Sequence, residues 1–262
     1  MSALASNLRV VRALGRRSVR QTFRRPQLLA PIIVFPTLLL AVQTGGAGEA
    51  VNLPGFPPVQ SFLQFMLAGA IMQSLMLAGN SGAIALAIEL ESGFTDRLLA
   101  APIWRVTIIL GRLTGTGALA LFGTLWFFAI GLLFGAHIDG GVGGALVSIL
   151  LAWTAALALG AIVASVALRT GNASVVQGLF PMVFVLLFLS TAFFPKDLMV
   201  EPAKTIASYN PLSFIVDGIR DPIISGVSAA DVRDAILSIA GLAVLGAYLS
   251  ASALRYRLRT GG

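Results

Sequence analysis

The sequence predicts an all-α membrane protein with six transmembrane helices. An N-terminal amphipathic interfacial helix, a short helix in a cytoplasmic loop, and extracellular re-entrant or interfacial helices before the last span complete the predicted fold. The chain is 57% hydrophobic and 11% charged, whereas soluble domains are about 25% charged. Apolar runs long enough to cross about 30 Å of hydrocarbon recur along it. Basic residues gather at the ends of alternate runs, as is typical of multi-pass proteins. We expect residues 1–262 to form a single transmembrane domain.

The N-terminal segment, residues 1–26, is expected to be a basic amphipathic helix on the cytoplasmic membrane surface. Spacings of three and four place five arginines on one face: Arg9, Arg12, Arg16, Arg20 and Arg24. Such a helix lies among headgroups, attracted by anionic lipid, until Pro26 ends it. A frayed basic tail that only sets topology is the alternative. The first long apolar run begins near Leu28, behind this segment, so we expect no cleaved signal peptide.

Six apolar segments are predicted to span the membrane: residues 28–43, 62–88, 106–134, 142–168, 173–193 and 235–254. Pro31 and Pro36 in the first segment predict a kink or a broken turn. In the third, Gly111-x-x-x-Gly115 permits close approach of another helix.

The distribution of basic residues predicts the orientation of the chain. Residues 1–26, 89–112, 168–171 and 255–262 carry 7, 3, 1 and 3 arginines, fourteen in all, and three acids. The remaining connecting segments carry four basic residues and eight acids. We therefore expect the first set, and both termini, to be cytoplasmic. Because the arginines lie at the ends of apolar runs, the net charge of +7 does not indicate a nucleic-acid partner.

Residues 89–105 form a half-polar cytoplasmic loop between the second and third spans. Gly93 can end the incoming helix and Pro102 can end the next one, which predicts a short helix over residues 94–101. Phe94, Leu98 and Ala101 share one side of it. A short loop gains nothing by showing these side chains to water, so they lie on lipid or fit into a partner.

This loop resembles the one after the second span in type-2 ATP-binding-cassette exporter permeases. The matching residues are Glu91, Gly93, Asp96, Arg97, Leu98, Leu99, Pro102, Gly111 and Arg112. Many relatives have threonine in place of Phe94 and lysine in place of Arg112. A second signature comes after the fifth span, in "FFPKDLM" (193–199) and "YNPLSFIVDGIR" (209–220). The similarity is closest to permeases of the daunorubicin-resistance type.

The resemblance implies a coupling helix that docks on a separate cytoplasmic ATPase subunit. Its residues would be Glu91, Gly93, Phe94, Asp96, Arg97, Leu98, Leu99 and Pro102. ATP and Mg²⁺ would then bind the partner, and a second permease copy or a related permease would complete the pathway in the plasma membrane. The expected function is efflux of an amphipathic drug, lipid or glycolipid. A sodium-driven or uncoupled secondary transporter and a non-transporting membrane anchor are the alternatives.

The residues that the chain lacks exclude several activities. Its two lysines, Lys196 and Lys204, come after proline and alanine, so it has no Gly-Lys-Ser/Thr phosphate loop. One histidine, His137, and no cysteine predict no metal site and no disulfide. We expect no cofactor in this chain and no enzymatic activity. The spans hold no ionisable residue away from their ends, which argues against proton coupling.

Four amide side chains lie inside or near the predicted spans, where an unpaired amide is costly. They are Gln64, Gln73, Asn80 and Gln177. Hydrogen bonding between helices is one interpretation. The other is that some of them line the transport pathway.

The outer segment, residues 194–233, contains the helical pattern "SFIVDGIRDPII". Asp217 and Arg220 are spaced to pair on it. We expect a re-entrant or interfacial helix over the outer end of the pathway, with a plain surface loop as the alternative.

Overall fold

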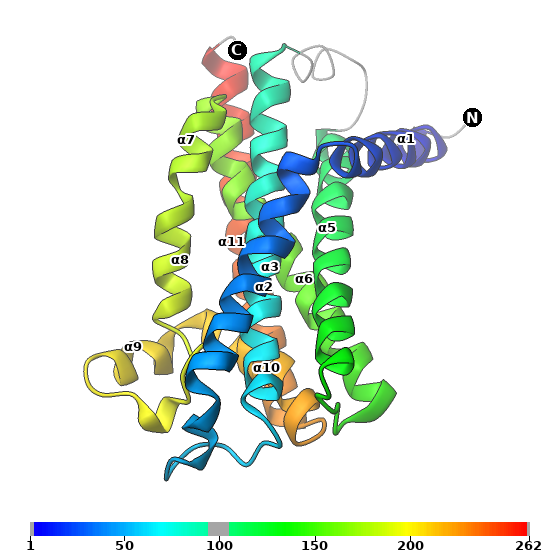
Figure 1. Ribbon diagram of the computed structural model, residues 1–262. Helices are drawn as coiled ribbons and strands as arrows, with labels where there is room; N and C mark the ends of the chain where they lie inside the picture. Colours follow the sequence, from blue (N-terminus) through cyan, green and yellow to red (C-terminus); the bar gives the residue numbers. More distant parts are fainter. Residues whose placement is uncertain (1–2, 94–104, 261–262) are drawn as a thin grey trace.

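The structure, a computed structural model, describes residues 3–93 and 105–260, and all regular elements in these ranges are helical (Figure 1). The first half contains α1 (Ala3–Phe23), α2 (Pro26–Ala47), the 3-10 helix η1 (Gly48–Asn52), α3 (Phe62–Glu91) and α5 (Arg105–Leu133). The second half contains α6 (Gly141–Thr170), α7 (Ala173–Gly178), α8 (Phe180–Phe188), η2 (Lys196–Leu198), α9 (Ala203–Tyr209), α10 (Pro211–Ile224) and α11 (Ala229–Thr260).

Within the described residues, five helices are long and apolar enough to cross a membrane: α2, α3, α5, α6 and α11. Each coincides with a predicted span, so the prediction of a multi-pass membrane protein is confirmed. Pro31 and Pro36 both lie inside α2. The helix continues through them, so of the two predicted outcomes the broken turn is wrong, and the kink stays a prediction.

The predicted fifth span, residues 173–193, is not one continuous helix. It is divided into α7 and α8, and the apolar helical stretch ends at Phe188. Pro181 is the reason: it stands in the first turn of α8 and has no N–H to donate to the carbonyl of Gln177. Placed end to end, α7 and α8 still run along the bundle beside the long helices (Figure 1).

Helix α3 forms the centre of the bundle. The apolar 18-residue stretch that marks α3 as a span is completely buried inside the protein. In α2 and α11, 17% and 22% of the corresponding stretch are buried. A helix that is apolar on every side belongs in a protein interior, and α3 packs against α2, α5, α6, α7 and α10. The outward faces of α2 and α11 expose large apolar side chains, among them Leu38, Val42, Leu237 and Val244, as contact with lipid or another membrane subunit requires.

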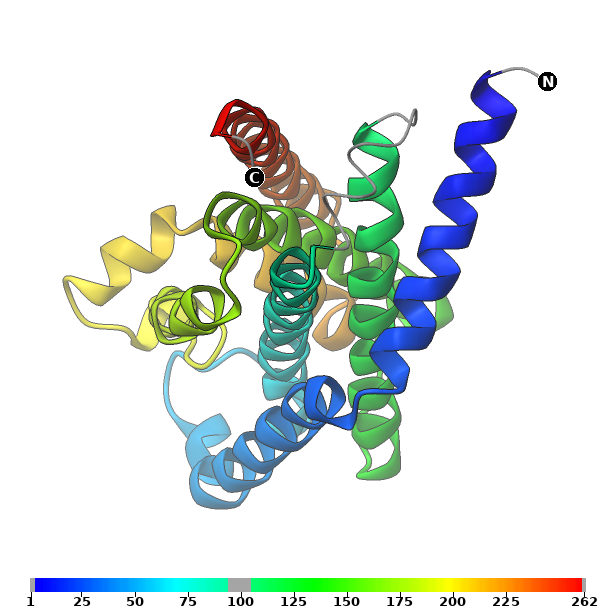
Figure 2. The same cartoon turned by 90° about the horizontal axis from the view of Figure 1, so that it is seen from above.

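The first and last described residues lie at the same end of the bundle, which we call the terminal end (Figure 1). There α1 lies across the axis of the long helices and extends beyond α5 (Figures 1 and 2). Helices α9 and α10 lie toward the opposite end, which we call the distal end. Of the predicted outer segment, α10 is a mostly buried helix packed on α3, α6 and α11. The alternative of a plain surface loop there is therefore wrong.

Candidate functional site

The residues predicted to couple the chain to a motor come between α3 and α5 in the sequence, and the end of α3 that precedes them lies at the terminal end (Figure 1). Two of them, Glu91 and Gly93, are described. The others, Phe94, Asp96, Arg97, Leu98, Leu99 and Pro102, lie outside the described residues. Gly93 comes after α3 with a backbone φ of +67°, a left-handed conformation that glycine adopts without steric cost. The prediction that the helix before the loop ends near this glycine is therefore confirmed.

Glu91, the last residue of α3, is bonded to the first residue of α7. Its Oε1 accepts a hydrogen bond of 2.8 Å from the backbone N–H of Ala173. The next two N–H groups of α7, those of Ser174 and Val175, donate to Asn172 Oδ1 at 2.8 and 3.2 Å. Side chains thus cap the first three amides of α7, and a carboxylate is favourable at a helix N-terminus. The bond ties the start of the loop to α7.

Glu89, one half-turn earlier, connects the same end of α3 to α1. Its side chain is largely buried, and Oε1 lies 3.6 Å from Arg17 Nη2. With its amide oriented to satisfy both neighbours, Gln21 donates to Glu89 Oε1 at 2.9 Å and accepts from Arg25 Nη2 at 3.1 Å. The residues just before the loop therefore contact α1 through Glu89 and α7 through Glu91.

Helix α1 is held against α5 by the predicted Gly111-x-x-x-Gly115 pair. A Cβ on Gly111 would lie 2.6 Å from Leu14 Cβ, and one on Gly115 would overlap Ser18 Oγ. These glycines let the two backbones approach closely. The two glycines thus allow α1 to pack closely across α5.

The four amides are not brought together into one site. Gln64 is fully buried near the distal end. It donates to the carbonyls of His137 and Ile223 at 3.0 and 3.1 Å and accepts from Gln60 N–H at 3.0 Å. The bond to Ile223 of α10 joins two helices, which is one of the two interpretations that the sequence left open, and the other two bonds join Gln64 to loops. Gln177 is exposed on α7.

Gln73 and Asn80 lie two turns apart in the middle of α3, and both are buried. Among the described residues, Gln73 Oε1 and Asn80 Oδ1 have no hydrogen-bond partner, and neither has Ser74 Oγ. An unpaired buried polar atom destabilises a folded protein by about 1–3 kcal/mol. This polar stretch of α3 therefore has hydrogen-bonding capacity that the described residues leave unused.

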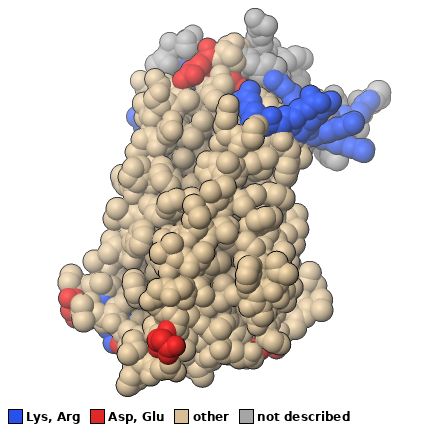
Figure 3. All heavy atoms as spheres, in the orientation of Figure 1, with Lys and Arg blue, Asp and Glu red and all other residues tan. Residues whose placement is uncertain are grey.

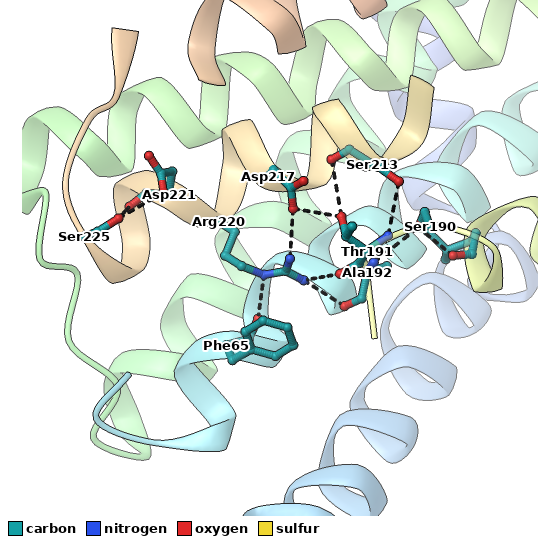
Figure 4. A network of polar contacts seen from close by, with 10 residues as sticks. Phe65, Ser190, Thr191, Ala192, Ser213, Asp217, Arg220, Asp221 and Ser225 are labelled. Carbon is teal, nitrogen blue, oxygen red and sulfur yellow. Dashed lines mark hydrogen bonds and ion pairs between the residues drawn. The ribbon is translucent and has the colours of Figure 1, made fainter. Parts of the chain in front are cut away.

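A second polar network, centred on Arg220 of α10, lies near the distal end (Figure 4). Arg220 is 5% exposed. Its guanidinium donates to Asp217 Oδ1 at 3.0 Å and to the carbonyls of Phe65, Thr191 and Ala192 at 3.3, 2.7 and 3.0 Å. It also stands 4.0 Å from the centre of the Phe65 ring. The predicted Asp217–Arg220 pair is confirmed, and one side chain joins α10, α3 and the residues after α8.

Burial dominates the electrostatics of this pair. Desolvation raises the pKa of Asp217 above its ordinary value, although Arg220 and the hydroxyl of Thr191 act in the opposite direction. Thr191 Oγ1 donates to Asp217 Oδ1 at 2.8 Å. The carboxylate is thus held in place at some electrostatic cost. Sequence reasoning missed the three carbonyl partners of Arg220, because no side-chain pattern marks a backbone acceptor.

Comparison with known proteins identifies the family. Residues 36–254 match the model of the ABC-2 family transporter proteins, well over half of the chain. The chain belongs to the ABC-2 transporter family. The family resemblance predicted from the loop and from the segment after α8 is confirmed, and the chain is a membrane subunit of such a transporter. The matched range includes the whole of α3 and the Arg220 network, whereas α1 lies outside it.

Curated ABC-2 relatives extend over most of the chain. A putative transport permease named ycf38 from Porphyra purpurea is 29% identical over 266 residues, 95% of this chain and 89% of that protein. Its counterpart from Pyropia yezoensis is 26% identical over 272 residues, 97% and 91% of the two chains. The daunorubicin resistance ABC transporter permease protein DrrB1 of Streptomyces coeruleorubidus is 26% identical over 232 residues, 86% and 78% of the two chains.

Proposed function

We propose that the chain is the membrane-spanning subunit of an exporter driven by ATP hydrolysis on a separate subunit. Membership of the ABC-2 family carries this proposal. The sequence has no phosphate-binding loop, so ATP and Mg²⁺ would bind the partner. The name of DrrB1, a daunorubicin resistance permease, favours efflux of an amphipathic drug, lipid or glycolipid.

In this proposal the chain crosses the plasma membrane six times, with α7 and α8 together as the fifth crossing. The first and last described residues lie at one end of the bundle (Figure 1), as an even number of crossings requires. The arginine-rich segments, with fourteen basic residues against four, favour a cytoplasmic terminal end. Helix α1 would then lie in the inner headgroup layer, and α10 would be a re-entrant helix on the outer side.

The ATPase would act on the loop between α3 and α5. Phe94 and Leu98 would fit into the partner, with Asp96, Arg97, Leu99 and Pro102 shaping the docking helix. The bond from Glu91 to Ala173 and the contact from Glu89 to Arg17 support this. A displaced loop would pull on α7 and α1 as well as on the two helices that it joins. Movement would thus reach several helices at once.

Two permease chains, identical or related, would enclose the pathway. The exposed apolar faces of α2 and α11 suit lipid or a neighbouring permease. Gln73 and Asn80, whose buried oxygens have no hydrogen-bond partner among the described residues, are the best placed of the four pathway candidates. Gln177, which is exposed on α7, would contribute near the terminal end, whereas Gln64 is fully buried and hydrogen-bonded and fits the pathway least well. A largely apolar solute with a few polar groups would match this lining.

The test is gentle extraction of the tagged chain from its host membrane, followed by identification of bound proteins and reconstitution in liposomes. Doxorubicin, a fluorescent amphipathic drug, serves as the transport probe. Co-purification of a nucleotide-hydrolysing subunit, and doxorubicin efflux that stops without ATP, are the expected results. Transport by the purified chain under a sodium gradient without ATP would support a secondary transporter instead. A stable complex with another membrane enzyme and no flux under any gradient would support an anchor.

A further inference from the structure

One face of α1 carries a concentration of arginines at the elbow with α2. Arg16, Arg17, Arg20, Arg24 and Arg25 line an open hollow of about 840 Å³, together with Ala13 and Gln21. We call this hollow the arginine groove. Figure 3 shows the arginines as a blue band on the terminal end, above a largely uncharged face. Among the described residues, Glu89 is the carboxylate that contacts the lining, through Arg17 and Gln21. The groove therefore keeps a large excess of positive charge.

Part of the lining of the groove is held in place by contacts behind it. Arg17 contacts Glu89, and Arg25 donates to Gln21, which itself donates to Glu89. On the opposite face of α1, Gly15 is buried against Thr114 of α5. Arg16, Arg20 and Arg24 stay exposed and stand one turn apart, about 6 Å, along the helix. An anion that binds here meets three arginines spaced along one side of the helix.

The position of the groove selects the kind of anion. Helix α1 lies across the long helices, at the end where these apolar helices stop (Figures 1 and 2). This is the depth of the phospholipid headgroups. Two to three turns beyond the elbow, α2 exposes Val34 and Leu38, at 52% and 61%. A molecule with phosphate in the groove could thus lay hydrocarbon chains along α2, which a free phosphate or an acidic peptide would not use.

We propose that the arginine groove is a binding site for the phosphate headgroup of an acidic phospholipid. Guanidinium groups bind phosphate oxygens through paired, charge-assisted hydrogen bonds. Five arginines exceed what one phosphate neutralises, so the site favours a headgroup with two phosphates, such as that of cardiolipin, over one with a single phosphate. The site does not depend on the transported solute or on the ATPase, because its residues belong to α1 and the turn that leads into α2.

The test compares two triple variants with equal loss of charge, both at the terminal end of the bundle. The groove variant is Arg16→Gln, Arg20→Gln, Arg24→Gln. The control, Arg12→Gln, Arg255→Gln, Arg259→Gln, changes exposed arginines outside the groove. Each full-length protein is purified in mild detergent and titrated with cardiolipin, phosphatidylglycerol, phosphatidylcholine and inorganic phosphate, and bound lipid is counted by native mass spectrometry. Circular dichroism and size-exclusion chromatography check the fold.

A specific site predicts that cardiolipin binds the wild type and the control equally, more tightly than phosphatidylglycerol, and phosphatidylcholine hardly at all. Each arginine near a membrane surface contributes about a fivefold increase in affinity for acidic lipid. The groove variant should therefore bind cardiolipin about a hundredfold more weakly. Its normal helix content and elution volume would show that the loss is local.

Other outcomes overturn the proposal. Equal losses in both variants would mean that overall charge, not the groove, attracts acidic lipid. Unchanged binding in the groove variant would place the lipid elsewhere. Displacement of cardiolipin by inorganic phosphate at similar concentration would identify a free phosphate as the ligand. Unchanged lipid binding with loss of a co-purified protein from the groove variant alone would identify an acidic protein surface as the ligand.

Discussion

The carboxylate of Glu91 accepts a hydrogen bond of 2.8 Å from the backbone N–H of Ala173, 82 residues further along the chain. This bond joins the end of the central helix α3 to the first residue of the broken helix α7–α8. In a transporter that receives movement at the loop after α3, it is a direct mechanical link to another membrane helix. Removal of the bond should therefore affect coupling more than it affects folding.

Glu91→Ala should weaken the coupling of ATP hydrolysis to transport in the reconstituted complex. The variant leaves the Ala173 N–H without its side-chain cap, and lost caps destabilise a helix end by about 0.5–2 kcal/mol. Glu91→Gln keeps an acceptor oxygen and should retain most coupling. The measurement is solute moved per ATP hydrolysed.

Asn172→Ala is the matched control for this experiment. It removes the caps on Ser174 and Val175 but leaves the bond between the loop and α7. It should lower thermal stability about as much as Glu91→Ala while the ratio of transport to hydrolysis stays normal. If both variants uncouple equally, the link has no special role and only the stability of α7 matters.

Phe94→Ala combined with Leu98→Ala should leave membrane insertion intact and uncouple hydrolysis from transport. The two side chains are predicted to seat the loop helix in the ATPase, and truncation of side chains buried at the centre of an interface weakens binding. Co-purification of the ATPase and efflux from liposomes are the readouts. Leu133→Ala with Phe134→Ala makes the same chemical change at side chains 79% and 72% exposed at the distal end, and should behave as wild type. Normal coupled efflux in the first double variant would contradict the docking hypothesis.

Local sequence patterns determine some features of this fold and leave others out. Hydropathy and length located five long helices, since crossing hydrocarbon imposes a minimum apolar length. The Asp217–Arg220 pair could be predicted from spacing on one helix. The Glu91–Ala173 bond and the carbonyl partners of Arg220 join segments far apart in the chain, so no local pattern contains them. The break at Pro181 was visible in the sequence, but hydropathy averages do not register a missing N–H.

Arg220→Met should be strongly destabilising. It leaves Asp217 without its cation and removes the donors from three carbonyls, and breaking a buried ion pair from one side costs about 3–5 kcal/mol. We expect a loss of stability at the lower end of this range, because the Asp217 side chain is 42% exposed. Thermal unfolding in detergent measures the change. Arg233→Met breaks the exposed pair with Asp234 and should leave the midpoint unchanged. Similar decreases of the unfolding midpoint in the two variants would contradict the idea that burial makes the loss of Arg220 costly.

Protonation of Asp217 should contribute to the pH dependence of the stability of the protein. Because burial raises its pKa in the folded protein, the folded state holds the proton more tightly than the unfolded state, whose pKa is about 3.9. The contribution of this proton to stability is fully present below the unfolded pKa and decreases as the pH rises through the folded pKa. Asp217→Asn should remove this decrease. The unfolding midpoint of the wild type should therefore fall relative to that of the variant as the pH rises above about 4, and parallel curves would refute the assignment.

The orientation of the chain can be tested directly, because the sequence contains no cysteine. Single cysteines at Gly48, Ala100, Thr170 and Thr205 would be treated with a membrane-impermeant thiol reagent on intact cells and on inverted vesicles. Gly48 comes directly after α2 and Thr205 belongs to α9, so both should react from outside. Ala100 and Thr170 should react only in inverted vesicles, since the arginine-rich terminal end is predicted to face the cytoplasm. Labelling of positions 170 and 205 from the same side would mean that α7 and α8 do not cross the membrane, and five crossings would then replace six.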